Sequence, residues 1–132
     1  MSAPRVLIVD DNAMNATVAQ VVLSADGFDI ESAADADEAV QKIDLFRPDL
    51  ILMDIQLPGV DGLELTRRLK AAPSTQHIVI VAFTAFAMRG DAEKMRAAGC
   101  DSYVSKPIDV NKFAAQIRSL LRSPVSGLAG MP

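Results

Sequence analysis

Short apolar runs alternate along the chain with longer stretches in which apolar residues recur every three or four positions. The first pattern is typical of buried strands and the second of amphipathic helices. Because each run is followed by a helical stretch, the sequence predicts a parallel sheet with helices on both faces. The predicted strands are Arg5–Val9, Asp29–Ser32, Leu50–Met53, Ile78–Phe83 and Tyr103–Ser105.

The first and last helices are predicted from one apolar stripe each. The first is expected to stop near Gly27, since glycine readily ends a helix, and the last to start at Asp109. The expected buried stripe of the first helix is Met14, Val18, Val21, Val22 and Ala25, and that of the last is Val110, Phe113, Ala114, Ile117, Leu120 and Leu121.

The three middle helices have clear end signals. The second begins with the cap Asp35, followed three residues later by a glutamate, and ends before Pro48. The third covers about residues 62–72 and stops at a proline. The fourth runs from about Asp91 to Gly99, which suits a left-handed helix end.

The composition of the strands predicts their order. The first, third and fourth are apolar throughout, as expected for strands covered on both faces, whereas the second and fifth are mixed and resemble edges. With right-handed crossovers this gives the order 2-1-3-4-5, a flavodoxin-like doubly wound (βα)5 α/β fold. We expect one domain over residues 1–122 and a flexible tail over 123–132, which has no periodicity.

Composition narrows the class of protein. The 132 residues suit one domain, and a net charge of −4 argues against nucleic acid as a direct ligand. No run of 18 apolar residues is present, so no membrane insertion is expected. The N-terminus lacks a signal-peptide pattern and Cys100 has no cysteine to pair with, which together predict a cytoplasmic protein.

The candidate functional residues lie where the predicted strands end. Asp10 and Asp11 follow the first strand, Asp54 the third, Thr84 the fourth and Lys106 the fifth. The carboxyl ends of parallel strands share one crevice, so three carboxylates, a hydroxyl and an ammonium are expected to meet there. That set suits a hard divalent cation and a phosphoryl group, with Mg²⁺ relieving the repulsion between the carboxylates.

Each residue also has an ordinary structural interpretation. Asp10 or Asp11 can cap a helix, and Asp54 can form an Asx-turn. Thr84 can be a buried β-branched residue, and Lys106 a solvated surface lysine. That all of these ordinary interpretations apply at once, at successive strand ends, is less economical than a single shared site.

The motifs resemble the receiver domain of bacterial two-component response regulators. The similarity covers residues about 5–122 and is carried by four segments: D10-D11, L50-I-L-M-D-I-Q-L-P-G-V-D-G62, T84-A85 and K106-P107. The stretch from Thr84 together with G99-C-D-S-Y-V-S-K-P107 is similar to single-domain receivers of the DivK type, which implies a role in cell-cycle or division signalling. Receivers of hybrid kinases carry similar stretches, so an excised receiver is an alternative.

The resemblance implies a role for each site residue. Asp54 accepts a phosphoryl group from a histidine kinase or histidine phosphotransfer protein, and the protein then signals to a downstream protein target. Mg²⁺ is organised by Asp10, Asp11, Asp54 and the main-chain carbonyl of Gln56, with Asp11 coordinating more directly than Asp10. The protein is thus expected to act as a phosphoacceptor with self-catalysed transfer and slow acyl-phosphate hydrolysis, not as an enzyme.

The same resemblance implies that Thr84 and Lys106 bind the phosphoryl oxygens and that the Lys106–Pro107 bond is cis. Tyr103 matches the switch aromatic that works with Thr84; its alternative is an edge-strand aromatic with its hydroxyl in water. Met14 either begins the buried stripe or lies exposed beside the acids, where a kinase helix can dock. Gln56 and Phe86 influence acyl-phosphate hydrolysis, and Phe86 either shields the phosphoryl group or packs on its loop.

Two rival functions fit the topology. An aspartyl-phosphate phosphatase of the haloacid dehalogenase type needs a second aspartate two residues after the nucleophile, where this chain has Gln56. A flavin-binding module needs a phosphate-cradling loop after the first strand, where this chain has Asp10 and Asp11.

Overall fold

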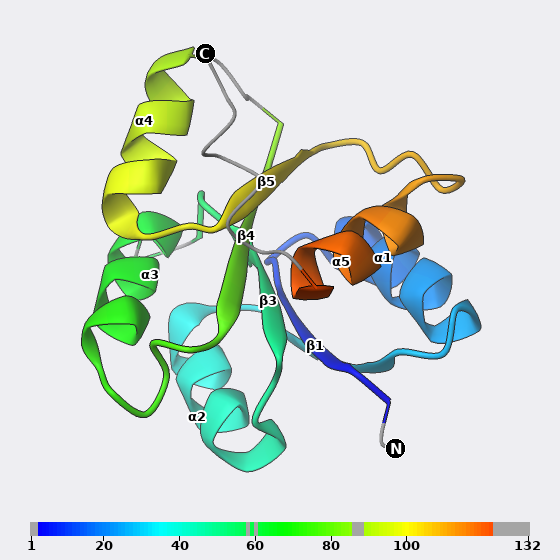
Figure 1. The fold of residues 1–132 in the computed structure, drawn as a ribbon, viewed down its shortest axis with the longest axis horizontal. Coiled ribbons are helices and arrows are strands. Elements are labelled where there is room, and N and C mark those ends of the chain that lie inside the picture. Colours follow the sequence, from blue (N-terminus) through cyan, green and yellow to red (C-terminus); the bar gives the residue numbers. More distant parts are fainter. Residues whose placement is uncertain (1–2, 58, 60, 86–88, 123–132) are drawn as a thin grey trace.

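The computed structural model describes residues 3–57, 59, 61–85 and 89–122. Five parallel strands form one sheet in the order β2-β1-β3-β4-β5, which confirms the predicted doubly wound α/β fold (Figure 1). The strands are β1 (Arg5–Val9), β2 (Asp29–Ala33), β3 (Leu50–Asp54), β4 (Val79–Thr84) and β5 (Ser102–Ser105), and the helices are α1 (Ala13–Ala25), α2 (Ala36–Phe46), α3 (Gly62–Ala71), α4 (Arg89–Ala98) and α5 (Phe113–Arg122).

The sheet separates two hydrophobic core clusters. Helices α2, α3 and α4 cover one face, and α1 and α5 cover the other (Figure 1). Successive strand residues point to opposite faces, so Leu7 and Val9 belong to the first cluster while Val6 and Ile8 belong to the second. Because β1, β3 and β4 lie inside the sheet and are covered on both faces, nearly every residue in them is buried.

The predicted buried stripe of α1 was wrong. Met14, Val18 and Val21 are exposed, Met14 at 76%. Ala25 is also exposed and Val22 is half-buried. Apolar residues occur on almost every side of this helix, so the 3.6-residue period fits more than one face. The face that packs carries alanines, which let the helix backbone approach the sheet closely. The buried residues of α1 are Ala16, Ala19 and Leu23.

Helix α5 begins at Phe113, four residues later than predicted. Residues 109–112 form a turn in which the Asp109 side chain accepts a hydrogen bond from the Asn111 amide at 3.0 Å. Aspartate commonly offers its own backbone such a turn in place of a helix. Val110 therefore lies outside the helix and is 57% exposed, whereas the rest of the predicted stripe is buried or half-buried.

The remaining boundaries differ from the prediction by one or two residues. Helix α4 begins at Arg89, two residues early, and ends just before Gly99, which has the expected positive φ of 103°. Helix α2 ends at Phe46, and its C-cap Arg47, just before Pro48, has a left-handed φ of 53° although it is not a glycine. The predicted tail, residues 123–132, lies outside the described residues.

Candidate functional site

The sheet brings the five predicted residues together at one edge. Asp10 follows β1, Asp54 ends β3 and Thr84 ends β4. Lys106 follows β5, and its amide donates to the Thr84 carbonyl at 2.8 Å. A cavity of about 270 Å³ lies between them. Its lining residues are Asp10, Asp11, Asn12, Asn15, Asp54, Gln56, Thr84, Ala85 and Lys106.

Local turns hold one oxygen of each buried carboxylate. Oδ1 of Asp10 accepts from the Asn12 amide at 2.8 Å, and Oδ1 of Asp54 accepts from the Gln56 amide at 2.9 Å. The N-cap of α1 is Asn12, which accepts from the Asn15 amide, so the helix-cap interpretation of Asp10 and Asp11 was wrong. The turn predicted for Asp54 is present, and it leaves Oδ2 of that carboxylate for other contacts.

Lys106 is not a solvated surface lysine. Its side chain is 15% exposed, and Nζ lies 3.1 Å from Oδ2 of Asp10 and 3.4 Å from Oδ2 of Asp54. The ammonium nevertheless lies outside hydrogen-bonding geometry for Asp10, since Oδ2 of Asp10 is a buried oxygen without a hydrogen-bond partner among the described residues. A buried acceptor without a hydrogen bond is costly, so this oxygen, which already lies beside one ammonium, is suited to a further cationic ligand.

Burial raises the pKa of Asp54 above its usual range, and the nearby charge of Asp10 adds to the increase. The Gln56 amide and the Lys106 ammonium lower this pKa, but they only partly offset the loss of water. The carboxylate form of Asp54 is therefore disfavoured in the protein alone. A cation beside it would favour the charged form.

The oxygen set fits a hard divalent cation. One carboxylate oxygen each from Asp10, Asp11 and Asp54 lie within 4.8 Å of one another; Asp10 and Asp54 are buried and Asp11 is exposed. Carboxylate oxygens are the ligands that Mg²⁺ prefers, and Mg²⁺ usually keeps several waters, which an exposed ligand on the solvent side permits. The chain thus contains an acidic cluster suited to Mg²⁺.

The structure also places the other predicted positions. Tyr103 is half-buried in β5, packs against the core cluster of the α2–α4 face and lines cavities of about 450 and 490 Å³ beside α5. Met14 takes the exposed alternative. Phe86 lies outside the described residues. The Lys106–Pro107 peptide bond is cis.

The sequence prediction missed the asparagines of α1. Asn12 caps the helix and Asn15, one turn further, is half-buried and lines the cavity. A capping-type residue just before the first helix was the available signal for Asn12. Asn15 had no such signal, because only the orientation of α1 turns it toward the acids.

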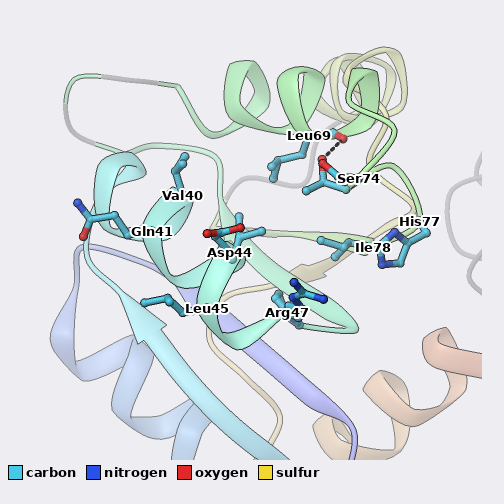
Figure 2. Close-up of a pocket in the computed structure, with 12 residues that line it drawn as sticks. Val40, Gln41, Asp44, Leu45, Arg47, Leu69, Ser74, His77 and Ile78 are labelled. Carbon is cyan, nitrogen blue, oxygen red and sulfur yellow. Dashed lines mark hydrogen bonds between the residues drawn. The ribbon is translucent and has the colours of Figure 1, made fainter.

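A larger cavity of about 890 Å³ lies between α2 and α3, away from the acids (Figure 2). Its apolar part includes Ile43, Leu69 and Ile78, and Asp44, Arg47 and His77 also line it. Arg47 is the C-cap of α2, where the partial negative charge of the helix end favours a cation. The cavity brings together no set of groups suited to phosphoryl chemistry.

Comparison with known proteins identifies the family. The family model described as response regulator receiver domain matches residues 6–118. The chain belongs to the response regulator receiver domain family. The polar-differentiation response regulator DivK of Brucella anthropi is 46% identical over 116 residues, which is 88% of this chain and 94% of that protein. DivK of Brucella abortus is 45% identical over the same shares.

Solved receiver structures share the fold. A CheY-like receiver domain protein from Methanospirillum hungatei has a TM-score of 0.84 at 28% identity, covering 93% of this chain and 97% of that one. The chemotaxis response regulator CheY4 of Vibrio cholerae has a TM-score of 0.84 at 23% identity, covering 90% and 99%, and shows likeness of fold alone. Among the described residues, no helix is long and apolar enough to span a membrane.

Proposed function

We propose that this receiver takes a phosphoryl group on Asp54 from a histidine kinase or histidine phosphotransfer protein and signals through phosphorylation-dependent binding of another protein. The observation that carries the proposal is the position of Asp54. It is a buried carboxylate at the end of a central strand, with Oδ2 facing Lys106 and two further carboxylates beside it. Asp10, in contrast, is held under the ammonium and serves better as a ligand than as an acceptor.

The transfer step follows from these groups. An oxygen of Asp54 attacks phosphorus, the bond from phosphorus to the donor's histidine nitrogen breaks with its electron pair, and an acyl phosphate forms on the chain. Mg²⁺, when bound, would neutralise charge on the transferring oxygens. Lys106 supplies a second positive charge, and the buried Thr84 lies at the same edge, where its hydroxyl can bind a phosphoryl oxygen.

Asp10, Asp11, Asp54 and the main-chain carbonyl of Gln56 are the ligands proposed for Mg²⁺. Oδ2 of Asp10, which lacks a hydrogen-bond partner among the described residues, supports its inclusion. Asp11 is exposed and free of local turn contacts among those residues, which supports direct coordination. The side chain of Gln56 has an amide where a phosphatase of the dehalogenase type needs an acid, so the acyl phosphate is expected to hydrolyse slowly.

The proposed output is a change of packing around Thr84 and Tyr103. Tyr103 is half-buried on the edge strand β5, packs against the core cluster of the α2–α4 face and also lines two cavities beside α5, so its ring borders open space in which a second arrangement can form. A phosphoryl group adds about two negative charges at the sheet edge and can bias such an equilibrium. By similarity to DivK, a polar-differentiation response regulator, the pathway proposed is cell-cycle or division control.

Exposed apolar residues on α1 suit the docking of the phosphodonor. Met14 and Val18 lie on the first turns after the acidic loop and are exposed at 76% and 38%. Apolar residues exposed beside a polar site are common where another protein binds. A helix of the donor packed there would place its histidine near Asp54.

Intact mass after incubation with acetyl phosphate and Mg²⁺ tests the acceptor. The protein should gain one phosphoryl group, and Asp54→Asn, which keeps the shape but removes the nucleophile, should gain none. Asp61→Asn is a matched control, because Asp61 caps α3 in the loop that follows Asp54 and is not in the acidic cluster. An adduct that persists in Asp54→Asn would contradict the assignment.

A further inference from the structure

The ammonium of Lys106 has a third neighbour in addition to the two carboxylates. Nζ lies over the ring of Phe83, 4.8 Å from its centroid. Phe83 precedes Thr84 in β4 and is paired in register with Asp54 on β3 and Val104 on β5. The ring is 1% exposed and belongs to the core cluster of the α1–α5 face, so the surrounding core fixes its position.

The two carboxylates attract the ammonium, but neither fixes its direction through a well-formed hydrogen bond. The contact with Asp10 lacks hydrogen-bonding geometry, and the 3.4 Å contact with Asp54 exceeds the usual range for an N–H···O bond. A lysine side chain has a flexible four-carbon stem and loses much conformational freedom when it is ordered. The face of an aromatic ring attracts a cation within about 6 Å, and the attraction grows where water is excluded, as it is around this 15% exposed side chain.

We infer that Phe83 is a positioning residue for phosphoryl transfer, because its ring face holds the Lys106 ammonium against the acceptor carboxylate. This inference rests on the function proposed for Asp54. The ring belongs to the hydrophobic core, and the same ammonium also contacts both carboxylates. Lys106 is therefore already ordered at the place where phosphoryl oxygens arrive, and the transfer step does not have to order it.

Ring fluorination separates the charge of the ring face from its shape. Phenylalanines carrying one, two or three ring fluorines, introduced at position 83, weaken cation attraction stepwise while nearly keeping ring volume. The initial rate of phosphoryl incorporation from acetyl phosphate in saturating Mg²⁺ should fall with each fluorine. Phe83→Leu, which removes the ring face, should lower it by roughly two- to thirty-fold, the range expected for one cation–π contact.

Phe113 provides the matched control. It is fully buried in the same core cluster, so fluorination or leucine there perturbs the packing without changing the ring below Lys106. Equal rates across the Phe83 series, or equal losses in the Phe83 and Phe113 series, would overturn the inference. Absence of any adduct in the unaltered protein would instead overturn the proposed function of Asp54.

A second measurement does not depend on phosphorylation. The ε-methylene protons of Lys106 should resonate upfield of ordinary lysine values, because they adjoin Nζ, which lies over the ring face, and the Phe83→Leu variant should lose this displacement. Ordinary shifts in the unaltered protein would show that the contact does not form in solution. The fluorinated series answers the question even if Phe83→Leu fails to fold.

Discussion

Gly62 is predicted to be essential for the position of the acceptor peptide. It is the first residue of α3, and its amide donates to the Ile55 carbonyl at 3.2 Å. A Cβ added there would lie 2.1 Å from the backbone oxygen of Asp54 and 2.8 Å from Cα of Ile55. Both neighbours are backbone atoms, so no side chain can swing away. Gly62→Ala should therefore push α3 and the Asp54–Ile55 peptide apart.

The size of the effect follows from these distances. An unstrained carbon-to-oxygen contact is about 3.3 Å, so a separation of roughly 1.2 Å must be gained by moving backbone. Overpacking of this kind costs about 1–3 kcal/mol, and the lower entropy of an unfolded alanine returns about 0.4–1 kcal/mol. The net loss of stability should lie between about 0 and 2.6 kcal/mol, with a central value of about 1.3 kcal/mol. A displacement on the order of 1 Å at the acceptor can also slow transfer by about a hundredfold.

Urea unfolding and the rate of phosphoryl incorporation measure the two effects together. Gly59→Asn is the control for the same loop, because a Cβ there meets nothing within 4 Å and asparagine tolerates the positive φ of 80°. Thr66→Val is the control for stability, since it removes the 2.9 Å bond from Thr66 to the Gly62 carbonyl without pushing on Asp54. The reasoning fails if Gly62→Ala keeps both the urea midpoint and the rate of the unaltered protein.

Three further predictions concern charge and burial. In metal-free buffer at neutral pH, Asp54→Asn should be more stable than the unaltered protein. Because burial raises the pKa of Asp54, ionising this carboxyl destabilises the folded protein as pH rises from 3.8 through the folded pKa. Urea midpoints at several pH values should show the advantage of the variant shrinking in acid, and a constant advantage would contradict this. Asp11→Ala should weaken Mg²⁺ binding in a titration, whereas Asp37→Ala, at an exposed position of α2, should not, and equal affinities would refute the ligand set. Burial raises the pKa of the Cys100 thiol to about 11, so Cys100 should react with a disulfide reagent at pH 8 only after the protein unfolds. Rapid labelling of the native protein would show that the thiol is not buried.

The alternation of apolar runs and helical stretches in the sequence determined the architecture. The apolar runs starting at Val6 and Leu50 have to be covered on both faces, and this requirement alone places their strands inside a parallel sheet. The convergence of Asp10, Asp54, Thr84 and Lys106 followed from topology, since parallel strands open toward the same edge. These features depend on local sequence and on general rules of chain connection.

Rotation of α1 about its axis could not be predicted in the same way. Its sequence is apolar on most sides, so the choice of Ala16 and Ala19 as the packed face depends on how closely the sheet lets the helix approach. The same rotation exposes Met14 and turns Asn15 toward the acidic cavity. A periodic pattern predicts that a helix has a buried face, but when apolar residues lie on every side of the helix the pattern does not predict which face is buried.

Contacts between residues far apart in the chain were decided by the tertiary structure alone. The approach of Gly62 to the Asp54 carbonyl and the stacking of Lys106 over Phe83 involve atoms placed by different elements. Sequence specified which chemical groups stand at each strand end, because residue type and strand length fix them locally. Distances, burial and the lack of a hydrogen bond to Oδ2 of Asp10 among the described residues depend on the packing of all five strands and their helices, and no local pattern encodes them.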